Sequence, residues 1–135
     1  MGRQRALMGA LLDTHALIWW VEGDDRITAR LRQLLGSPQE DVFVSAATAW
    51  EIATKVRIGK LQLAEEFLQN FLDAVEALGF RPLPISLRHG YEAGRLPGPH
   101  RDPFDRMLAA QALAEDLVLV SADPAFNALG VSTFW

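Results

Sequence analysis

The sequence predicts a three-layer α/β/α domain built around a small, mostly parallel β-sheet. Short apolar runs of strand length alternate with longer segments of helical composition, as in parallel sheets joined by crossover helices. The chain has 135 residues and half of them are apolar, which is enough for a buried core. We therefore expect residues 1–135 to form one domain, with residues 1–7 as a flexible basic extension.

Strands and helices are expected to alternate in the first half of the chain. The short apolar run LMGALL predicts a buried strand at Leu7–Leu12, and the β-branched, aromatic VFVS predicts another at Val42–Ser45. The expected helices are His15–Val21, Thr28–Leu35, Ala46–Ile58 and Glu65–Leu78. The apolar side of the last helix is formed by Phe67, Phe71, Leu72, Val75 and Leu78.

Proline positions organise the second half of the chain. Two prolines in Arg81–Ile85 restrict that segment to a sheet edge or an irregular strand. Asp102 followed by Pro103 has the form of an N-cap and first helical residue. The remaining expected elements are a helix at Leu87–Gly94, a loop at Leu96–Arg101, a helix at Pro103–Glu115, and strands at Leu117–Val120 and Val131–Phe134.

The composition excludes several kinds of site. The chain has no cysteine, so disulfides and zinc–thiolate sites are absent, and its three histidines are not at zinc-ligand spacing. It has no glycine-rich dinucleotide or Walker motif and no recognisable serine–histidine–aspartate order. A formal net charge of −4 does not support a passive nucleic-acid binder, although an enzyme can approach nucleic acid through metal ions.

The N-terminal stretch MGRQRALMGALLD is basic and then apolar, as a signal peptide is. However, its apolar run is short and ends at Asp13 without a cleavage-like region. No segment is long enough to span a membrane. We therefore expect a cytoplasmic protein with no membrane partner.

Acidic residues recur after the predicted strands. Asp13 directly follows the first strand, Glu51 lies in the helix after the second, and Asp123 follows the strand Leu117–Val120. In open α/β sheets, ligands bind outside the carboxyl ends of the strands. The sequence therefore places these acids at the sheet edge where a site is expected.

Each acid also has a purely structural interpretation. Asp13, Asp102 and Asp123 could cap helices, and Asp105 would then be the third helical residue, where a carboxylate interacts favourably with the helix dipole. Glu51 and Lys55 form an i,i+4 pair of the favourable order. For Trp19 and Trp20, a place in the core or a subunit interface is expected, with base stacking as the alternative.

The positions of Asp105 and Glu51 on their helices favour a catalytic role over a purely structural one. Asp105 shares its side with Leu108, Ala109 and Ala112, which are expected to face the sheet. Glu51 shares its side with Ala47, Trp50, Thr54 and Ile58, and that helix is apolar almost all round. Burying unpaired carboxylates costs several kcal/mol unless a cation neutralises them. Asp102 lies one position outside its helix and fits a cap.

Several carboxylates at one crevice repel one another unless a cation lies between them. With oxygen ligands alone, that cation would be Mg²⁺ or Mn²⁺. Carboxylate clusters that hold one or two such ions are typical of enzymes that hydrolyse phosphodiesters. The sequence thus predicts a metal-dependent hydrolase.

Four motifs carry a resemblance to a known family. They are LLDTHALIWW, SAATAWEIATKVRIGKL, HRDPFDRMLAAQA and LVLVSADPAF, in the order and spacing typical of PIN domains. The resemblance covers Leu11 to Trp135, and it is in particular to the VapC-type toxin ribonucleases of toxin–antitoxin pairs. The resemblance implies a small parallel sheet and a Mg²⁺-dependent endoribonuclease that cuts single-stranded RNA or exposed loops.

The resemblance also implies roles for individual residues. Asp13 and Asp105 would bind the metal directly, Glu51 would hold a second ion or orient water, and Asp123 would act through water. Hydroxyls near the site would come from Thr14 and Ser121. Phosphate contacts are expected from Lys55, Lys60, Arg101 and Arg106, for which a solvated surface charge is the alternative.

The family implies partners as well. We expect a homodimer and a VapB-like antitoxin whose C-terminal segment lies over the acids. The antitoxin would supply DNA binding, so the toxin would contact DNA only indirectly. Two other functions stay open at this point: a catalytically silent PIN-fold interaction module, and a metal-dependent DNA nuclease or phosphatase.

Overall fold

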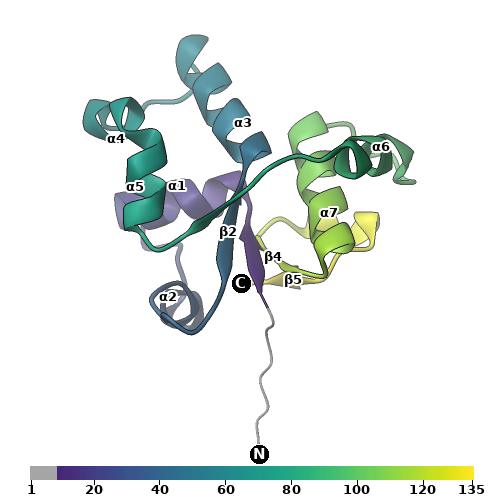
Figure 1. Cartoon of the computed structure of the whole chain (residues 1–135), viewed down its shortest axis with the longest axis horizontal. Coiled ribbons are helices and arrows are strands. Elements are labelled where there is room, and N and C mark those ends of the chain that lie inside the picture. Colours follow the sequence, from purple (N-terminus) through teal and green to yellow (C-terminus); the bar gives the residue numbers. More distant parts are fainter. Residues whose placement is uncertain (1–8) are drawn as a thin grey trace, which may run out of the picture.

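A computed structural model describes residues 9–135, in which a five-stranded sheet is covered by helices on both faces (Figure 1). The strand order is β3-β2-β1-β4-β5, and every pairing is parallel. The predicted α/β/α class is confirmed. The proposed extension at residues 1–7 and the first two residues of the predicted strand Leu7–Leu12 lie outside the described residues.

The elements largely follow the expected order. The strands are β1 (Ala10–Leu12), β2 (Val42–Ser45), β3 (Arg81–Leu83), β4 (Val118–Val120) and β5 (Thr133–Phe134). The helices are α1 (Thr14–Glu22), α2 (Ala29–Leu35), α3 (Ala46–Arg57), α4 (Glu65–Gln69), α5 (Phe71–Ala77), α6 (Leu87–Arg95), α7 (Pro103–Glu115) and the 3-10 helix η1 (Pro124–Leu129). None of the helices in residues 9–135 combines the length and apolar character needed to cross a membrane.

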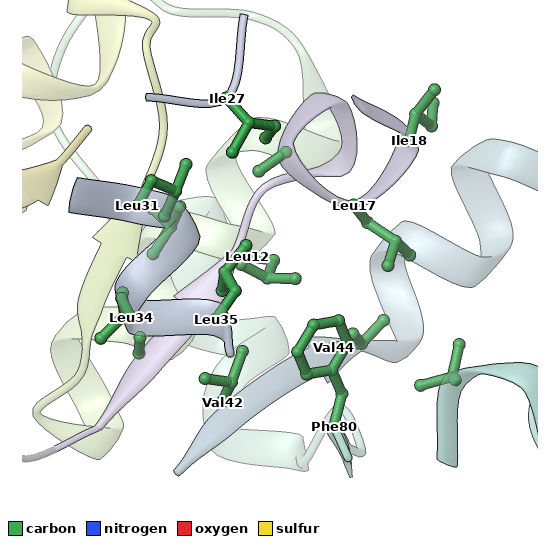
Figure 2. Packing of buried hydrophobic residues seen from close by; sticks show 14 of the residues in the cluster. Leu12, Leu17, Ile18, Ile27, Leu31, Leu34, Leu35, Val42, Val44 and Phe80 are labelled. Carbon is green, nitrogen blue, oxygen red and sulfur yellow. The ribbon is translucent and has the colours of Figure 1, made fainter. Parts of the chain in front are cut away.

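Successive side chains of β1 point to opposite faces of the sheet, and both faces are buried. Leu12 contributes to a core with α1, α2 and α5, which Figure 2 shows around Leu17, Leu31 and Val44. Leu11 points to the opposite face and packs with residues of α7, β4 and η1. Because successive strand residues point to opposite faces, one apolar strand serves both cores. Trp19 and Trp20 are partly buried against the first core, as expected for core residues.

Two predicted elements differ from the structure. The helix expected at Glu65–Leu78 is interrupted at Asn70, whose side-chain amide donates to the Glu66 carbonyl 3.0 Å away. This local bond competes with helix continuation, and Leu72, expected on the buried side, is 79% exposed. The segment Arg81–Ile85 forms an edge strand as predicted but ends at Leu83, since Pro84 has no N–H to donate.

The topology changes direction beside β1. The chain passes from β1 to β2 and β3 on one side, then returns to β4 on the other side of β1. The carboxyl ends of β1 and β4 therefore form a topological switch point, where α/β sheets bind ligands. α3 starts directly at the end of β2 and contacts both α1 and α7 (Figure 1).

Candidate metal centre

Asp13 lies at the carboxyl end of β1 and is 5% exposed. Its Oδ1 accepts from the Ala16 N–H at 2.8 Å, so the residue caps α1 at this edge of the sheet. Burial raises its pKa to about 6, while hydrogen bonds from Ser121 and Ala16 and the charge of His15 lower it; the charge of Asp105 raises it further. A cation at this carboxylate would relieve both burial and repulsion.

Glu51 lies in the second turn of α3 and is 4% exposed. One oxygen accepts from the Thr14 hydroxyl at 2.6 Å, and the other is 2.5 Å from the Lys55 ammonium. Thr14 also lies 3.2 Å from the Thr48 hydroxyl. These bonds join the start of α1 to α3 and hold the carboxylate at the sheet edge.

The inward side of α3 differs from the expected one. Ala47 is buried as predicted, but Trp50 and Ile58 are 61% and 49% exposed. The buried side instead runs through Thr48 and Ile52. The prediction that Trp50 and Ile58 face inward was wrong, because an almost entirely apolar helix does not reveal which side meets the sheet.

Asp105 lies in the first turn of α7, and its side chain is 23% exposed. Its Oδ2 is 2.9 Å from the His100 Nε2. Burial raises its pKa, as do the charges of Asp102 and Glu51, whereas the hydrogen bond and charge of His100 lower it. Asp105 thus interacts electrostatically with both Asp13 and Glu51.

Asp102 caps α7, as predicted. Its Oδ1 accepts from the N–H groups of Phe104 and Asp105, at 2.9 and 3.0 Å. The side of α7 below Asp105 is fully buried through Leu108, Ala109 and Ala112. Small residues on that side let α7 pack closely against β1 and β4.

Asp123 follows β4 but differs from the other acids in exposure. It caps η1 by accepting from the Ala125 N–H at 2.9 Å, and it is exposed. Its own N–H donates to the buried Ser121 hydroxyl at 3.0 Å. Ser121 therefore connects Asp123 to Asp13, and a role of Asp123 through water stays a prediction.

The four predicted phosphate-binding cations have different surroundings. Arg106 donates to the carbonyls of Ala93 and His100, at 3.0 and 2.9 Å, and to that of Leu96. It therefore holds the loop after α6 against α7, and its guanidinium is engaged by these carbonyls. Lys55 is paired with Glu51, whereas Arg101 and Lys60 are exposed.

The sequence profile of the PIN domain matches residues 10–131. The chain belongs to the PIN domain family. A sequence comparison with curated proteins gives no match.

Solved structures with the same fold include proteins of three organisms. VapBC2 from Rickettsia felis bound to a DNA fragment from its promoter has a TM-score of 0.72 and 18% identity, covering 94% of this chain and 98% of that one. DNA-bound VapBC from Salmonella typhimurium has a TM-score of 0.71 and 17% identity, covering 95% and 98%. FitAcB from Neisseria gonorrhoeae has a TM-score of 0.68 and 24% identity, covering 93% and 96%.

The donor atoms of this PIN domain fit a hard divalent ion, although the acids do not all converge. Within residues 9–135, no three acidic or histidine side chains are close enough together to hold a metal. Glu51 is turned to Thr14 and Lys55, and Asp105 to His100. Mg²⁺ usually retains several waters and takes only one or two protein carboxylates. Asp13 and Asp105 supply two such carboxylates, and the charge of Asp105 acts on Asp13.

Two residues at this site were missed by the sequence reasoning. His100 contacts Asp105, and Thr48 contacts Thr14. The spacing of His100 fits neither a zinc site nor a catalytic triad, and it lies in a proline-rich loop whose path has no periodic signal. Thr48 was detectable in principle, since it lies three residues before Glu51 on the same helix side.

Proposed function

We propose that this PIN domain is a metal-dependent endoribonuclease and the toxin of a toxin–antitoxin pair. The observation that carries the proposal is the position of Asp13 and Asp105. Both lie at the switch point beside β1, both have raised pKa values, and each contributes to the electrostatic environment of the site. A buried acid and a partly buried acid that repel each other at a sheet edge are well suited to hold a divalent ion.

The chain's own residues would position the reaction. Asp13 and Asp105 would hold a Mg²⁺ or Mn²⁺ ion, which when bound activates water and offsets the charge of the scissile phosphate. The Ala16 N–H and the Ser121 hydroxyl fix the Asp13 carboxylate. The His100 ring holds the Asp105 carboxylate through a hydrogen bond in the same way.

The remaining acids would act around this pair. Glu51, held by Thr14, would orient water or contribute to a second ion. Asp123 would act through water beside Ser121. Lys55, Lys60 and Arg101 would contact phosphates of the RNA strand, because cations beside an acidic centre offset the repulsion between the acids and a polyanion.

The structural neighbours support a protein partner. Three solved structures whose names contain VapBC or FitAcB share the fold across at least 93% of this chain. The VapC-type toxins that the motifs of this chain resemble pair with VapB-type antitoxins, so we propose such an antitoxin as its partner. A homodimer, and contact with DNA only through the antitoxin, remain part of the same proposal.

Cleavage by matched variants tests the proposed activity. Asp105→Asn removes a carboxylate that binds the ion, whereas Asp102→Asn makes the same charge change three residues earlier and preserves the cap, since asparagine caps as well as aspartate. We expect Mg²⁺-dependent RNA cleavage that leaves 5′-phosphates in the wild type and Asp102→Asn, and its loss in Asp105→Asn.

Three other results would argue against the proposal. Cleavage that persists in Asp105→Asn would contradict the assignment of that residue. No cleavage of any RNA by the wild type with Mg²⁺ or Mn²⁺ would favour a silent interaction module. Cleavage of DNA or of phosphate monoesters in preference to RNA would favour the nuclease or phosphatase alternative.

A further inference from the structure

Two aromatic side chains directly precede two of the site acids. Trp50 comes before Glu51 on α3, and Phe104 comes before Asp105 on α7. Their rings meet edge to face, with centroids 4.8 Å apart and an interplanar angle of 75°. This contact bridges the two helices that carry the acids.

The indole of Trp50 contacts Phe104 but remains largely exposed to solvent. The residue is 61% exposed, although its edge-to-face contact with Phe104 fixes the orientation of the ring. Aromatic pairs of this geometry are favourable by about 0.5–1.5 kcal/mol beyond the area that they bury. Trp50 therefore presents a large flat apolar surface to solvent, next to a buried carboxylate.

A small apolar hollow adjoins the aromatic pair. It has a volume of about 210 Å³, and its lining includes Trp50, Phe104, Ile85, Pro103 and Met107. A protein–protein interface generally buries more than about 1,000 Å² in total. One ring and one hollow of this size match a single planar group much better than a folded partner.

Positive charges follow Trp50 along the chain. Lys55, Arg57 and Lys60 come within ten residues of Trp50, in a protein whose formal net charge is −4. Arg57 is seven residues after Trp50, which places it two turns along on the same side of α3. An aromatic surface followed by cations is the pattern with which proteins bind single-stranded nucleic acid, the rings stacking on bases and the cations meeting phosphates.

We propose that Trp50, supported by Phe104, stacks on an unpaired nucleobase of the RNA strand whose phosphate lies at the acids. The proposal rests on the proposed function and refines it. It adds a base-binding residue for the single-stranded RNA that the family resemblance implies, because a paired base cannot leave its helix to reach the indole without a cost. Trp50 is a positioning residue and takes no part in the chemistry.

Binding without metal tests this proposal separately from cleavage. The probes are a fluorescein-labelled single-stranded adenosine RNA of about 12 nucleotides and an abasic strand of the same length, in EDTA. Base stacking on an aromatic ring is sequence-tolerant, and its removal by alanine weakens binding about tenfold. We expect Trp50→Ala to bind the RNA about tenfold less tightly than wild type, and Trp50→Phe to recover most of that loss.

The abasic strand distinguishes stacking from a general disturbance. Wild type is expected to bind it about as weakly as Trp50→Ala binds the RNA, and Trp50→Ala is expected to bind both strands equally. Tyr91→Ala is the matched control, since Tyr91 is 66% exposed on α6 and outside the aromatic pair. Its affinity for RNA should equal that of the wild type, and the melting temperatures of all variants should stay close together.

Two results would overturn the inference. One is an unchanged RNA affinity in Trp50→Ala, including the case in which only binding of a protein partner is weakened. The other is equal affinity of the wild type for the RNA and the abasic strand. If stacking is observed but the wild type cleaves no RNA with Mg²⁺ or Mn²⁺, the proposed function fails while the base-binding role of Trp50 stands.

Discussion

The ammonium of Lys55 lies 2.5 Å from Oε2 of Glu51. Glu51 is almost fully buried, whereas the Lys55 side chain is 37% exposed, so the cation reaches inward from the rim of the site. Glu51 and, more weakly, Asp102 and Asp105 raise the pKa of Lys55, which keeps it charged. Lys55 thus supplies part of the positive charge that the acids need in the protein without metal.

Replacing Lys55 by methionine is expected to destabilise the fold by about 1–3 kcal/mol, because the buried Glu51 would lose a charged donor. Glu51→Gln in the same chain should recover most of that loss, since a neutral amide needs no counter-charge. Urea denaturation of the two single variants and the double variant measures the coupling. Strictly additive changes in unfolding free energy would mean that the interaction between Lys55 and Glu51 does not contribute to stability.

Asp13 makes the stability of the metal-free protein depend on pH. Its pKa is about 6 in the folded state against an ordinary value of 3.8, so between these values the folded state holds a proton that the unfolded state has released. Stability from this group is therefore greatest below pH 3.8 and falls as the pH rises to about 6, by about 3 kcal/mol in all.

Asp13→Asn should remove this pH dependence while it keeps the cap on α1. The variant is expected to be more stable than the wild type at pH 8 in EDTA, and the difference should narrow toward pH 4. Thermal melts across that range are the measurement. Parallel curves for the two proteins would show that Asp13 is not the titrating group.

Arg106 is expected to act on stability rather than on RNA. Arg106→Lys keeps the charge but loses the planar group that meets the carbonyls of Ala93, Leu96 and His100. We expect a loss of about 2 kcal/mol in unfolding free energy and faster proteolysis of the loop at residues 96–101. An unchanged stability together with weaker RNA binding would restore Arg106 as a phosphate contact.

The sequence predicted the strands and the caps because both depend on local chemistry. LVLV and VFVS are short and apolar, and Asp102-Pro103 has one common structural use. The side of α7 that carries Asp105 was also correct, since its alanines and leucine mark a single buried side. These features could be recognised without knowing the tertiary structure.

The sequence failed to predict features that depend on how the helices and loops pack against the sheet. Trp50 looked like a core residue because its helix is apolar almost all round, and only the sheet and α7 determine which side is covered. The contact between His100 and Asp105 depends on the path of a loop, and the role of Arg106 depends on three carbonyls of α6 and the loop that follows it. The electrostatic interaction of Asp13 with Asp105 is likewise a product of the fold.

Binding of Mn²⁺ followed by electron paramagnetic resonance tests the central claim, that Asp13 and Asp105 hold a divalent ion. At pH 7.5 we expect the wild type and Asp102→Asn to bind Mn²⁺ with equal affinity, and Asp13→Asn and Asp105→Asn to bind it at least tenfold more weakly. Thermal melts confirm that each variant is folded. Wild-type affinity in folded Asp13→Asn or Asp105→Asn, or no binding by the wild type itself, would contradict the account.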